Sequence, residues 1–335
     1  MSASMFVFRH ATILGLIASG MAMPQPLIRR QNMTTSFTGF TDVDVLNYAL
    51  TLEHLEATFY SEGLDKFQNA DFTTAGFSVA VRNRIFEVAE HERVHVEFLT
   101  TALGSAATAA CNYTFPLSSV AEFLATASVL EGVGVSVYLG AARLIARSIL
   151  TIEARHSAYL RDLSSESKLS PFPAAQDVPL TPNEVFTLAS GLITSCPATN
   201  PKLPVKPFTA LSAGAPGPAI AGQTINVTTG NTVLARGSNT AKLSAAFITA
   251  AGPVFANLTE VGDGVTFTVN IPSSGILGHS YLVLCNCAER ADDQTIVAGP
   301  AIIEVSRPPV ITSGFWSDSA KCLIPFIHHP AICGF

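Results

Sequence analysis

Apolar residues recur every three to four positions between residues 41 and 163, which is the period of an amphipathic helix. The first predicted helix begins near Thr41, with Asp44 three residues later as a capping partner, and ends at Gly63. The second runs from Ser78 to Leu103, and Gly104 follows its end.

The third predicted helix starts at Ser118-Ser119, where Glu122 forms a capping box with Ser119. The fourth covers Ala146 to Leu163. A turn near Gly140–Arg143 would separate the two helices and let the carboxylates of Glu131 and Glu153 face each other. One continuous helix would instead hold these two residues about 33 Å apart. Four such helices joined by modest loops predict a four-helix bundle over residues 41–165.

The pattern changes after residue 165. Residues 166–207 are a Pro-rich linker with one short predicted helix, Pro182–Thr194. From 208 to 306, short runs rich in Val, Ile and Thr alternate with Gly, Pro, Asn and Ser clusters, which predicts a small Ig-like β-sandwich. The predicted fold class is therefore α + β and multidomain. The predicted strands are Thr224–Thr229, Ala245–Thr249, Val265–Ile271, Ser280–Leu284 and Ala301–Val305.

The two ends of the chain resemble neither region. Residues 1–23 place Arg9 before an apolar stretch that ends in small residues, which is typical of a signal peptide. Residues 24–40 are interpreted as a pro-segment and linker with a processing site at Arg29-Arg30, and residues 307–335 as an irregular tail. A secreted, extracellular or cell-wall protein without a transmembrane segment is therefore expected.

Charge narrows the classes of partner. The chain has 25 acidic and 19 basic residues, a net charge of −6. Removal of residues 1–30 would take away three basic and no acidic residues, leaving 16 − 25 = −9. Such a chain offers no basic surface for nucleic acid, so no nucleic-acid partner is expected. The acidic excess in the helical part indicates either a solvated surface or ligands for cations.

Secretion would permit disulfides and glycosylation. Cys111 and Cys196 flank the helical region and are a candidate pair. Cys285 and Cys287 face the same side of a predicted strand and are poorly placed to bond to each other. Four Asn-x-Thr sequons are candidate glycosylation sites: Asn32, Asn112, Asn226 and Asn257.

Two Glu-x-x-His motifs lie in the second and fourth predicted helices, at Glu92–His95 and Glu153–His156. Positions i and i+3 are about 60° apart around a helix and about 4.5 Å apart along it, so both side chains can face one bundle axis. The carboxylate can then bridge two ions while the imidazole binds one of them.

The first and third helices each add one Glu and one Tyr. Glu53 precedes Tyr60, and Glu131 precedes Tyr138, both by seven positions. Glu131 lies in an apolar segment where an unpaired charge is costly, which favours a ligand role over a surface role. Tyr residues more often only pack, but the repeated offset predicts hydroxyls that hydrogen-bond to the site carboxylates.

Four carboxylates and two imidazoles are the ligand set of di-iron and di-manganese bundles. Two Fe or Mn ions are the expected cofactors, and the charge of the carboxylates would balance that of two divalent ions. The predicted metal ligands are Glu53, Glu92, His95, Glu131, Glu153 and His156. The remaining Glu residues of these helices are expected at the surface or behind the ligands, because Glu seldom faces a core: Glu56, Glu62, Glu87, Glu90 and Glu97.

A competing motif overlaps the second helix. His91-Glu92-Arg-Val-His95 matches the His-Glu-x-x-His pattern of zinc proteases, in which Glu92 would act as a base. This interpretation leaves Glu53, Glu131 and the motif at Glu153–His156 without a role, so it is the minor alternative. Satisfied core histidines are a further alternative for His95 and His156.

The residues that carry this pattern resemble the ferritin-like superfamily, and within it secreted fungal proteins associated with stress response and sexual development. The resemblance implies a ferritin-like bundle with the six residues named above at the metal-ligand positions. Glu131 and Glu153 are closer in sequence than is usual in the superfamily, which implies a shortened helix pair. The matching segments are Leu46–Tyr60, His91–His95, Glu131–Gly140 and Ile152–His156.

Two classes of function follow from this pattern. One is a di-metal oxidase or peroxide-scavenging protein with O2 or peroxide as its partner. The other is a non-catalytic extracellular protein whose β-domain contacts a cell-wall component and whose metal only stabilises the bundle. Metal analysis and O2 or peroxide consumption would separate the two.

Overall fold

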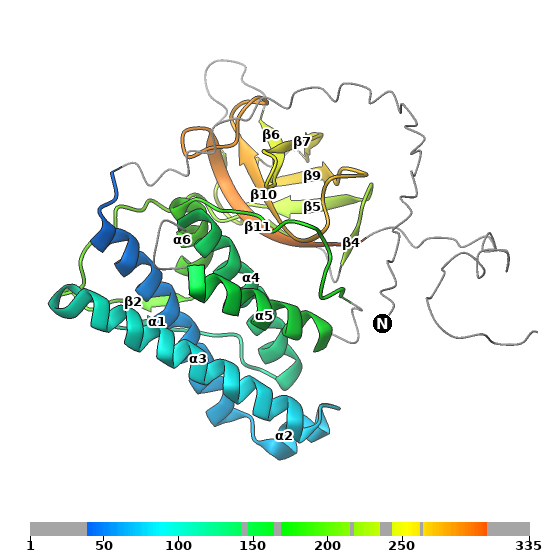
Figure 1. Cartoon of the computed structure of the whole chain (residues 1–335). Coiled ribbons are helices and arrows are strands. Elements are labelled where there is room, and N and C mark those ends of the chain that lie inside the picture. Colours follow the sequence, from blue (N-terminus) through cyan, green and yellow to red (C-terminus); the bar gives the residue numbers. More distant parts are fainter. Residues whose placement is uncertain are drawn as a thin grey trace, which may run out of the picture. The chain divides into compact units, whose positions relative to one another are not determined.

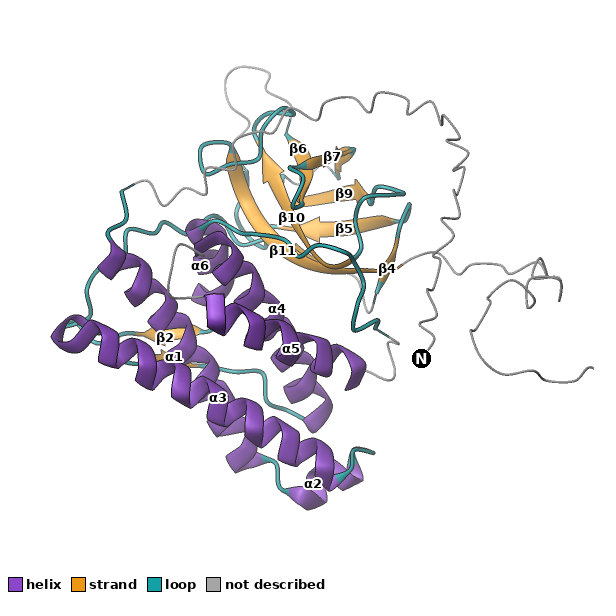
Figure 2. Cartoon of the chain, viewed as in Figure 1, coloured by secondary structure: helices purple, strands orange, loops and turns teal. Residues whose placement is uncertain are grey.

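The computed structural model of the chain describes residues 39–141, 147–163, 169–214, 218–234, 243–261 and 264–306. The predicted signal peptide, the predicted irregular tail and the sequon at Asn32 lie outside these residues. The helices gather in one group and most of the strands in another (Figure 1, Figure 2). The helices precede the strands of the two larger sheets along the chain, so the predicted α + β class is confirmed.

Four long helices make up the helical group: α1 (Asp42–Lys66), α3 (Val79–Leu103), α4 (Val120–Ala141) and α5 (Arg147–Leu163). Helix α1 packs against α3, α4 packs against α5, and α1 also contacts α4 (Figure 1). Their apolar faces meet in a shared core that includes Leu55, Phe59, Phe123 and Leu160. The period of apolar residues thus places all four helices on one core, as a bundle requires.

The ends of α1 and α3 show which of the helix ends predicted from the sequence are correct. The hydroxyl of Thr41 accepts from the Asp44 N–H, and the Asp44 carboxylate accepts from the Thr41 N–H, as the capping box predicts. Gly104 caps α3 with a positive φ of 56°. The predicted end of α1 at Gly63 is wrong, because the helix continues to Lys66. A Cβ at Gly63 would lie 2.1 Å from the Phe123 ring, so this glycine permits close packing instead of ending the helix.

Helices α4 and α5 begin where the sequence predicts. The Glu122 N–H donates to Ser119 Oγ (3.1 Å), while the Glu122 carboxylate accepts from the Ser118 N–H (2.8 Å), so two serines share the predicted box. Helix α4 ends at Ala141 and α5 begins at Arg147, and residues 142–146, which include part of the predicted turn, lie outside the described part. Two short helical segments were not predicted, α2 (Asn69–Thr74) and η1 (Gly104–Ala106).

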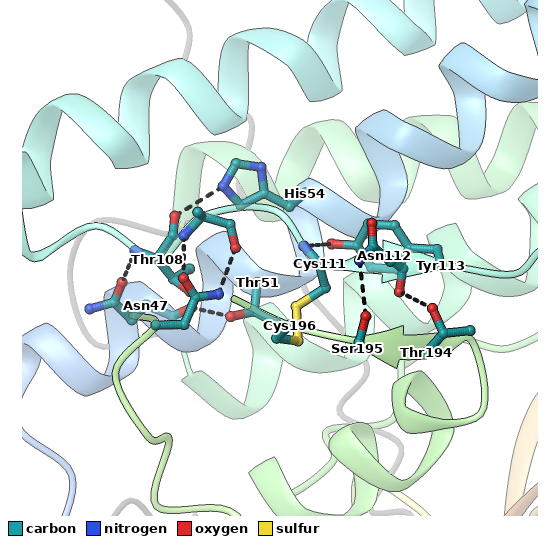
Figure 3. The surroundings of a disulfide bond; sticks show 12 residues. Asn47, Thr51, His54, Thr108, Cys111, Asn112, Tyr113, Thr194, Ser195 and Cys196 are labelled. Atoms are coloured by element: carbon teal, nitrogen blue, oxygen red, sulfur yellow. Dashed lines mark hydrogen bonds between the residues drawn. A yellow bond between two sulfur atoms is a disulfide. The ribbon is translucent and has the colours of Figure 1, made fainter. Parts of the chain in front are cut away.

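A disulfide joins Cys111 to Cys196, with the two Cα atoms 4.2 Å apart, and confirms the candidate pair (Figure 3). Beside it, β1 (Asn112–Tyr113) pairs with β2 (Ile193–Ser195). Helix α6 (Pro182–Ser190) is therefore shorter than the predicted Pro182–Thr194, because its last predicted residues enter β2. The side chain of Asn47 on α1 holds the loop before Cys111 in place, because it accepts a hydrogen bond from the Thr108 N–H and donates one to the Ala106 carbonyl (Figure 3).

The remaining strands form two sheets that face one another across a common core. One sheet has the order β4-β11-β10-β6-β7 and the other β3-β5-β9-β8. The core between them includes Ile225 and Val269 from one sheet and Phe247, Leu282 and Ile303 from the other, as in a β-sandwich. The strands are β3 (Ser212–Ala213), β4 (Ala219–Ile220), β5 (Thr224–Thr228), β6 (Ser244–Ile248), β7 (Val254–Ala256), β8 (Leu258–Glu260), β9 (Thr266–Asn270), β10 (Gly278–Cys285) and β11 (Ile296–Ser306).

Strands β10 and β11 also contact the bundle. The Tyr281 hydroxyl lies 2.8 Å from Ser136 Oγ of α4, and Arg161 of α5 donates two hydrogen bonds to the Glu304 carboxylate (2.8 and 2.7 Å). Among the described residues, one helix, Val120–Gly140, is long and apolar enough to cross a membrane, and 67% of its most apolar window is buried. Much of the apolar character of α4 thus serves contacts within the protein.

Candidate metal centre

The six predicted ligand residues lie together inside the bundle and come from all four long helices. Each is buried, and the most exposed, His95, is only 8% accessible. Their ligand atoms form two groups in which all atoms lie within 4.8 Å of one another. The first group is Glu53, Glu92, His95 and Glu153, and the second is Glu92, Glu131, Glu153 and His156. Glu92 and Glu153 belong to both groups.

His95 faces the first group through Nδ1. This atom lies 2.9 Å from Glu92 Oε2, 3.2 Å from Glu53 Oε2 and 3.4 Å from Glu153 Oε1. Since Glu92 and His95 are three residues apart on α3, the helix itself turns both toward the bundle axis. The local spacing thus produces the predicted convergence.

His156 occupies the corresponding place in the second group. Its Nδ1 lies 3.0 Å from Glu92 Oε1, 3.2 Å from Glu131 Oε2 and 3.9 Å from Glu153 Oε2. Glu131 of α4 and Glu153 of α5 therefore lie in one site.

Both tyrosines of the predicted pattern bind site carboxylates. The Tyr60 hydroxyl donates to Glu131 Oε1 (2.5 Å), and the Tyr138 hydroxyl donates to Glu53 Oε1. Tyr60 lies on α1 and Glu131 on α4, whereas Tyr138 lies on α4 and Glu53 on α1. Each tyrosine therefore orients the carboxylate of the opposite helix.

The chemistry of the donor set fits two divalent metal ions. Four carboxylates are buried beside only two imidazoles, which leaves an excess of negative charge that is costly without a cation. Among the described residues, neither oxygen of Glu153 accepts a hydrogen bond, although Oε1 lies 3.4 Å from His95 Nδ1. Carboxylate oxygens with imidazole nitrogens suit iron and manganese. The two groups of side chains can thus hold two metal ions.

The pKa values of the carboxylates follow from burial and from the two imidazoles. Burial raises the pKa of Glu53 to about 7 against the hydrogen bonds from His95 and Tyr138. Burial and the charges of Glu92 and Glu131 raise the pKa of Glu153 well above its usual value. Burial would also raise the pKa of Glu92, but hydrogen bonds from His156 and His95 outweigh it and lower the pKa to about 2.

Both imidazoles hold a proton tightly. Burial alone would lower the pKa of His95, but hydrogen bonds with Glu53 and Glu92 raise it to about 10. The pKa of His156 rises to about 9 because bonds with Glu131 and Glu92 likewise outweigh burial. Protons therefore compete with metal ions for the two nitrogens.

Glu56 is a member of the cluster that the sequence analysis assigned to the surface or to a place behind the ligands. It is only 5% exposed, and burial together with the charges of Glu131 and Glu53 raises its pKa well above the usual value. A Cβ at Gly134 would lie 3.2 Å from both Glu56 Oε1 and Glu153 Oε2, so this glycine leaves room for the two carboxyl groups. The i+3 spacing from Glu53 was the available signal.

His91, the first residue of the zinc-protease motif, does not join either donor group. Its side chain is on the exposed side of α3, and its Nδ1 lies 2.9 Å from Nε2 of His156. The two rings stack with their centroids 5.2 Å apart. His91 therefore contacts a member of the second group, and the geometry gives no support to a zinc site formed by His91 and His95.

Comparison with known proteins yields a family and a relative. A family described as the ferritin-like domain matches residues 41–166. Protein rds1 of Schizosaccharomyces pombe is 31% identical over 195 residues, which cover 55% of this chain and 48% of that protein. The chain thus spans about half the length of this fungal relative. Residues 41–166 therefore match a ferritin-like domain, as the resemblance of the four helices predicted.

Proposed function

We propose that this chain is a secreted ferritin-like protein that binds two iron or manganese ions in its bundle and reduces O2 or peroxide. The observation that carries the proposal is the sharing of Glu92 and Glu153 between two otherwise matching donor groups. Two carboxylates common to both groups are what a pair of bridged ions needs.

The remaining ligands divide evenly between the two ions. Glu53 and His95 would hold one ion, and Glu131 and His156 the other. Bound iron or manganese would supply the electrons for reduction of O2 or peroxide. Tyr138 and Tyr60 hold one oxygen each of Glu53 and Glu131, and the burial of all these groups keeps bulk water away.

Two features support secretion. The disulfide between Cys111 and Cys196 suits an oxidising compartment. The described sequon residues Asn112, Asn226 and Asn257 are all exposed, as glycosylation requires. As the resemblance implies, such a protein would act in stress response or development.

Metal analysis of the full chain tests the proposal. The purified protein is loaded with Fe(II) or with Mn(II), freed of excess ion and analysed for metal, together with O2 and peroxide consumption. The parent is expected to retain two ions per chain, and the double variant Glu131→Ala/His156→Ala to lose metal and consumption together. Glu97→Ala, an exposed change on α3, is the control and should match the parent.

Other outcomes would overturn the enzymatic proposal. A parent that retains no transition metal after loading contradicts it outright. Bound metal without any consumption of O2 or peroxide would favour the non-catalytic role, in which the β-sandwich contacts a cell-wall component. Zinc alone, with proteolysis that depends on Glu92, would favour the zinc-protease alternative.

A further inference from the structure

An apolar cavity of about 400 Å³ lies against the carboxylate cluster, between α1, α4 and α6. Leu52 and Leu55 of α1, Val133 and Val137 of α4, and Leu188 of α6 form much of its wall. Apart from Glu56 and Thr126, every described residue that lines it is apolar or glycine. Its volume lies within the range of about 300–1,000 Å³ typical of small-molecule sites.

The inner end of the cavity touches the metal centre. Glu56 and Gly134 line the cavity, and Glu56 is a buried neighbour of the ligand Glu53 on α1. Because Gly134 has no side chain, only a distance of 3.2 Å would separate its Cβ position from Glu153 Oε2. A molecule in the cavity would therefore end within reach of a shared ligand carboxylate.

The outer end of the cavity reaches the surface. Its lining includes Pro116, Ala125 and Val129, which are exposed. Small side chains at the mouth leave it open, whereas the leucines and valines farther in give it an aliphatic wall. An ion or a strongly polar molecule would lose its hydration on such a path without gaining partners.

We propose that this cavity binds a neutral aliphatic molecule and holds one end of it beside Glu56, at the edge of the metal centre. This molecule would be a substrate of the metal centre, and that role rests on the proposed di-metal function. The cavity itself does not depend on bound metal. Its size exceeds what O2 alone would need, so an organic molecule with an alkyl chain is the occupant that the wall fits.

A series of 1-alkanols tests the proposal on the full chain. Binding of 1-butanol, 1-hexanol and 1-octanol is measured by calorimetry, and affinity is expected to rise about fourfold per added methylene. Ala125→Phe places a ring at the mouth and should weaken 1-octanol binding about tenfold or more. Ala121→Phe, one turn earlier on the exposed side of α4 and outside the cavity, is the matched control and should bind as the parent does.

Methyl NMR gives a second measurement that needs no variant. 1-Octanol should shift the methyl signals of Leu52, Val133 and Leu188, and in the cobalt(II)-loaded protein it should change the visible bands of the metal. Equal 1-octanol affinity of Ala125→Phe and the parent, absence of binding, or shifts confined to other methyl groups would overturn the proposal.

The same samples separate this proposal from the proposed function. Metal content is measured for the parent and for Ala125→Phe beside each alkanol titration. Metal binding without alkanol binding would overturn the cavity proposal and leave the di-metal function standing. Alkanol binding at the three named residues in a chain that retains no metal would overturn the di-metal function and support the cavity as a site for an apolar ligand.

Discussion

The helix pair α1–α3 and the helix pair α4–α5 carry the same ligand pattern but surround it differently. Each pair supplies one Glu, a Tyr seven residues later, and a Glu-x-x-His motif on its second helix. Three residues after the first Glu, however, α1 has Glu56 and α4 has Gly134. The residue before the motif is His91 on α3 and Ile152 on α5.

These differences give the two donor groups unequal surroundings. Gly134 leaves room for Glu56 and lines the apolar cavity, and His91 places an exposed imidazole against His156. Each helix pair nevertheless donates one tyrosine hydrogen bond to the other pair, from Tyr60 to Glu131 and from Tyr138 to Glu53, and we call these two the exchanged hydrogen bonds. The centre therefore combines a symmetric ligand set with an asymmetric shell, and neither pair can assemble it alone.

The largest expected effect comes from a ligand that both groups share. Glu92→Gln should reduce the metal content from two ions to less than one, because both groups lose a ligand. His95→Ala and His156→Ala should each remove about one ion and leave the other, with a loss in affinity above about 100-fold at the affected position. Metal analysis of the loaded variants checks this, and an equal loss in all three would contradict the assignment of Glu92 to both groups.

A second large effect is expected from pH. In the metal-free protein the pKa values of about 10 for His95 and about 9 for His156 keep both protonated at pH 7, and metal binding must release these protons. Because the metal-free state binds the extra protons, affinity rises with pH. The product of the two binding constants should fall by at least about 100-fold between pH 7 and pH 6, because the two histidines release two protons. Glu53, with a pKa of about 7, and Glu153, whose pKa is raised, add to this number.

Calorimetry in buffers of different ionisation enthalpy counts the released protons. Glu92, with a pKa of about 2, is already ionised and should contribute none. In His156→Ala the remaining ion should release about one proton fewer than the pair does in the parent. Metal binding that releases no protons at pH 7 would contradict this account.

The sequence predicted the parts of the centre that depend on local geometry. Glu92 and His95 are neighbours on α3 by helix spacing alone, and the same holds for Glu153 and His156 on α5. Features that depend on distant packing were misjudged. Gly63 looked like a helix end, but its neighbour Phe123 lies 60 residues away in sequence and decides its role.

The sequence left Glu56 between the surface and a place behind the ligands, and it missed the short strands, for related reasons. A Glu on an amphipathic helix ordinarily faces solvent. The absence of a side chain at Gly134, on another helix, leaves room for the Glu56 carboxyl group in the core. Strands such as β3 and β4 have two residues each, too few for an alternating pattern, and exist because longer strands lie beside them.

A smaller effect is expected when the exchanged hydrogen bonds are removed. Tyr60→Phe frees one oxygen of Glu131, and Tyr138→Phe frees one oxygen of Glu53, without removing a ligand. Each change should weaken the ion held by the opposite helix pair about 10- to 100-fold and keep the stoichiometry at two. Stepwise metal titration followed by calorimetry checks this. If each variant weakened the ion on its own helix pair, the exchange would be refuted.

The smallest expected effect, that of removing the His91 imidazole, distinguishes the two helix pairs most directly. The His91 imidazole is 2.9 Å from Nε2 of His156, on the side of the ring away from the carboxylates. The described residues provide no hydrogen bond of this kind to Nε2 of His95. His91→Ala should therefore weaken only the ion held by Glu131 and His156.

The expected loss is about fivefold, the value of one hydrogen bond of roughly 1 kcal/mol. Glu87→Ala, an exposed change one turn earlier on α3, is the control and should leave both ions unchanged. Equal weakening of both ions by His91→Ala would mean that His91 acts through α3 as a whole. Weaker binding of one ion alone would show that a single exposed imidazole gives two otherwise matching donor groups unequal metal affinity.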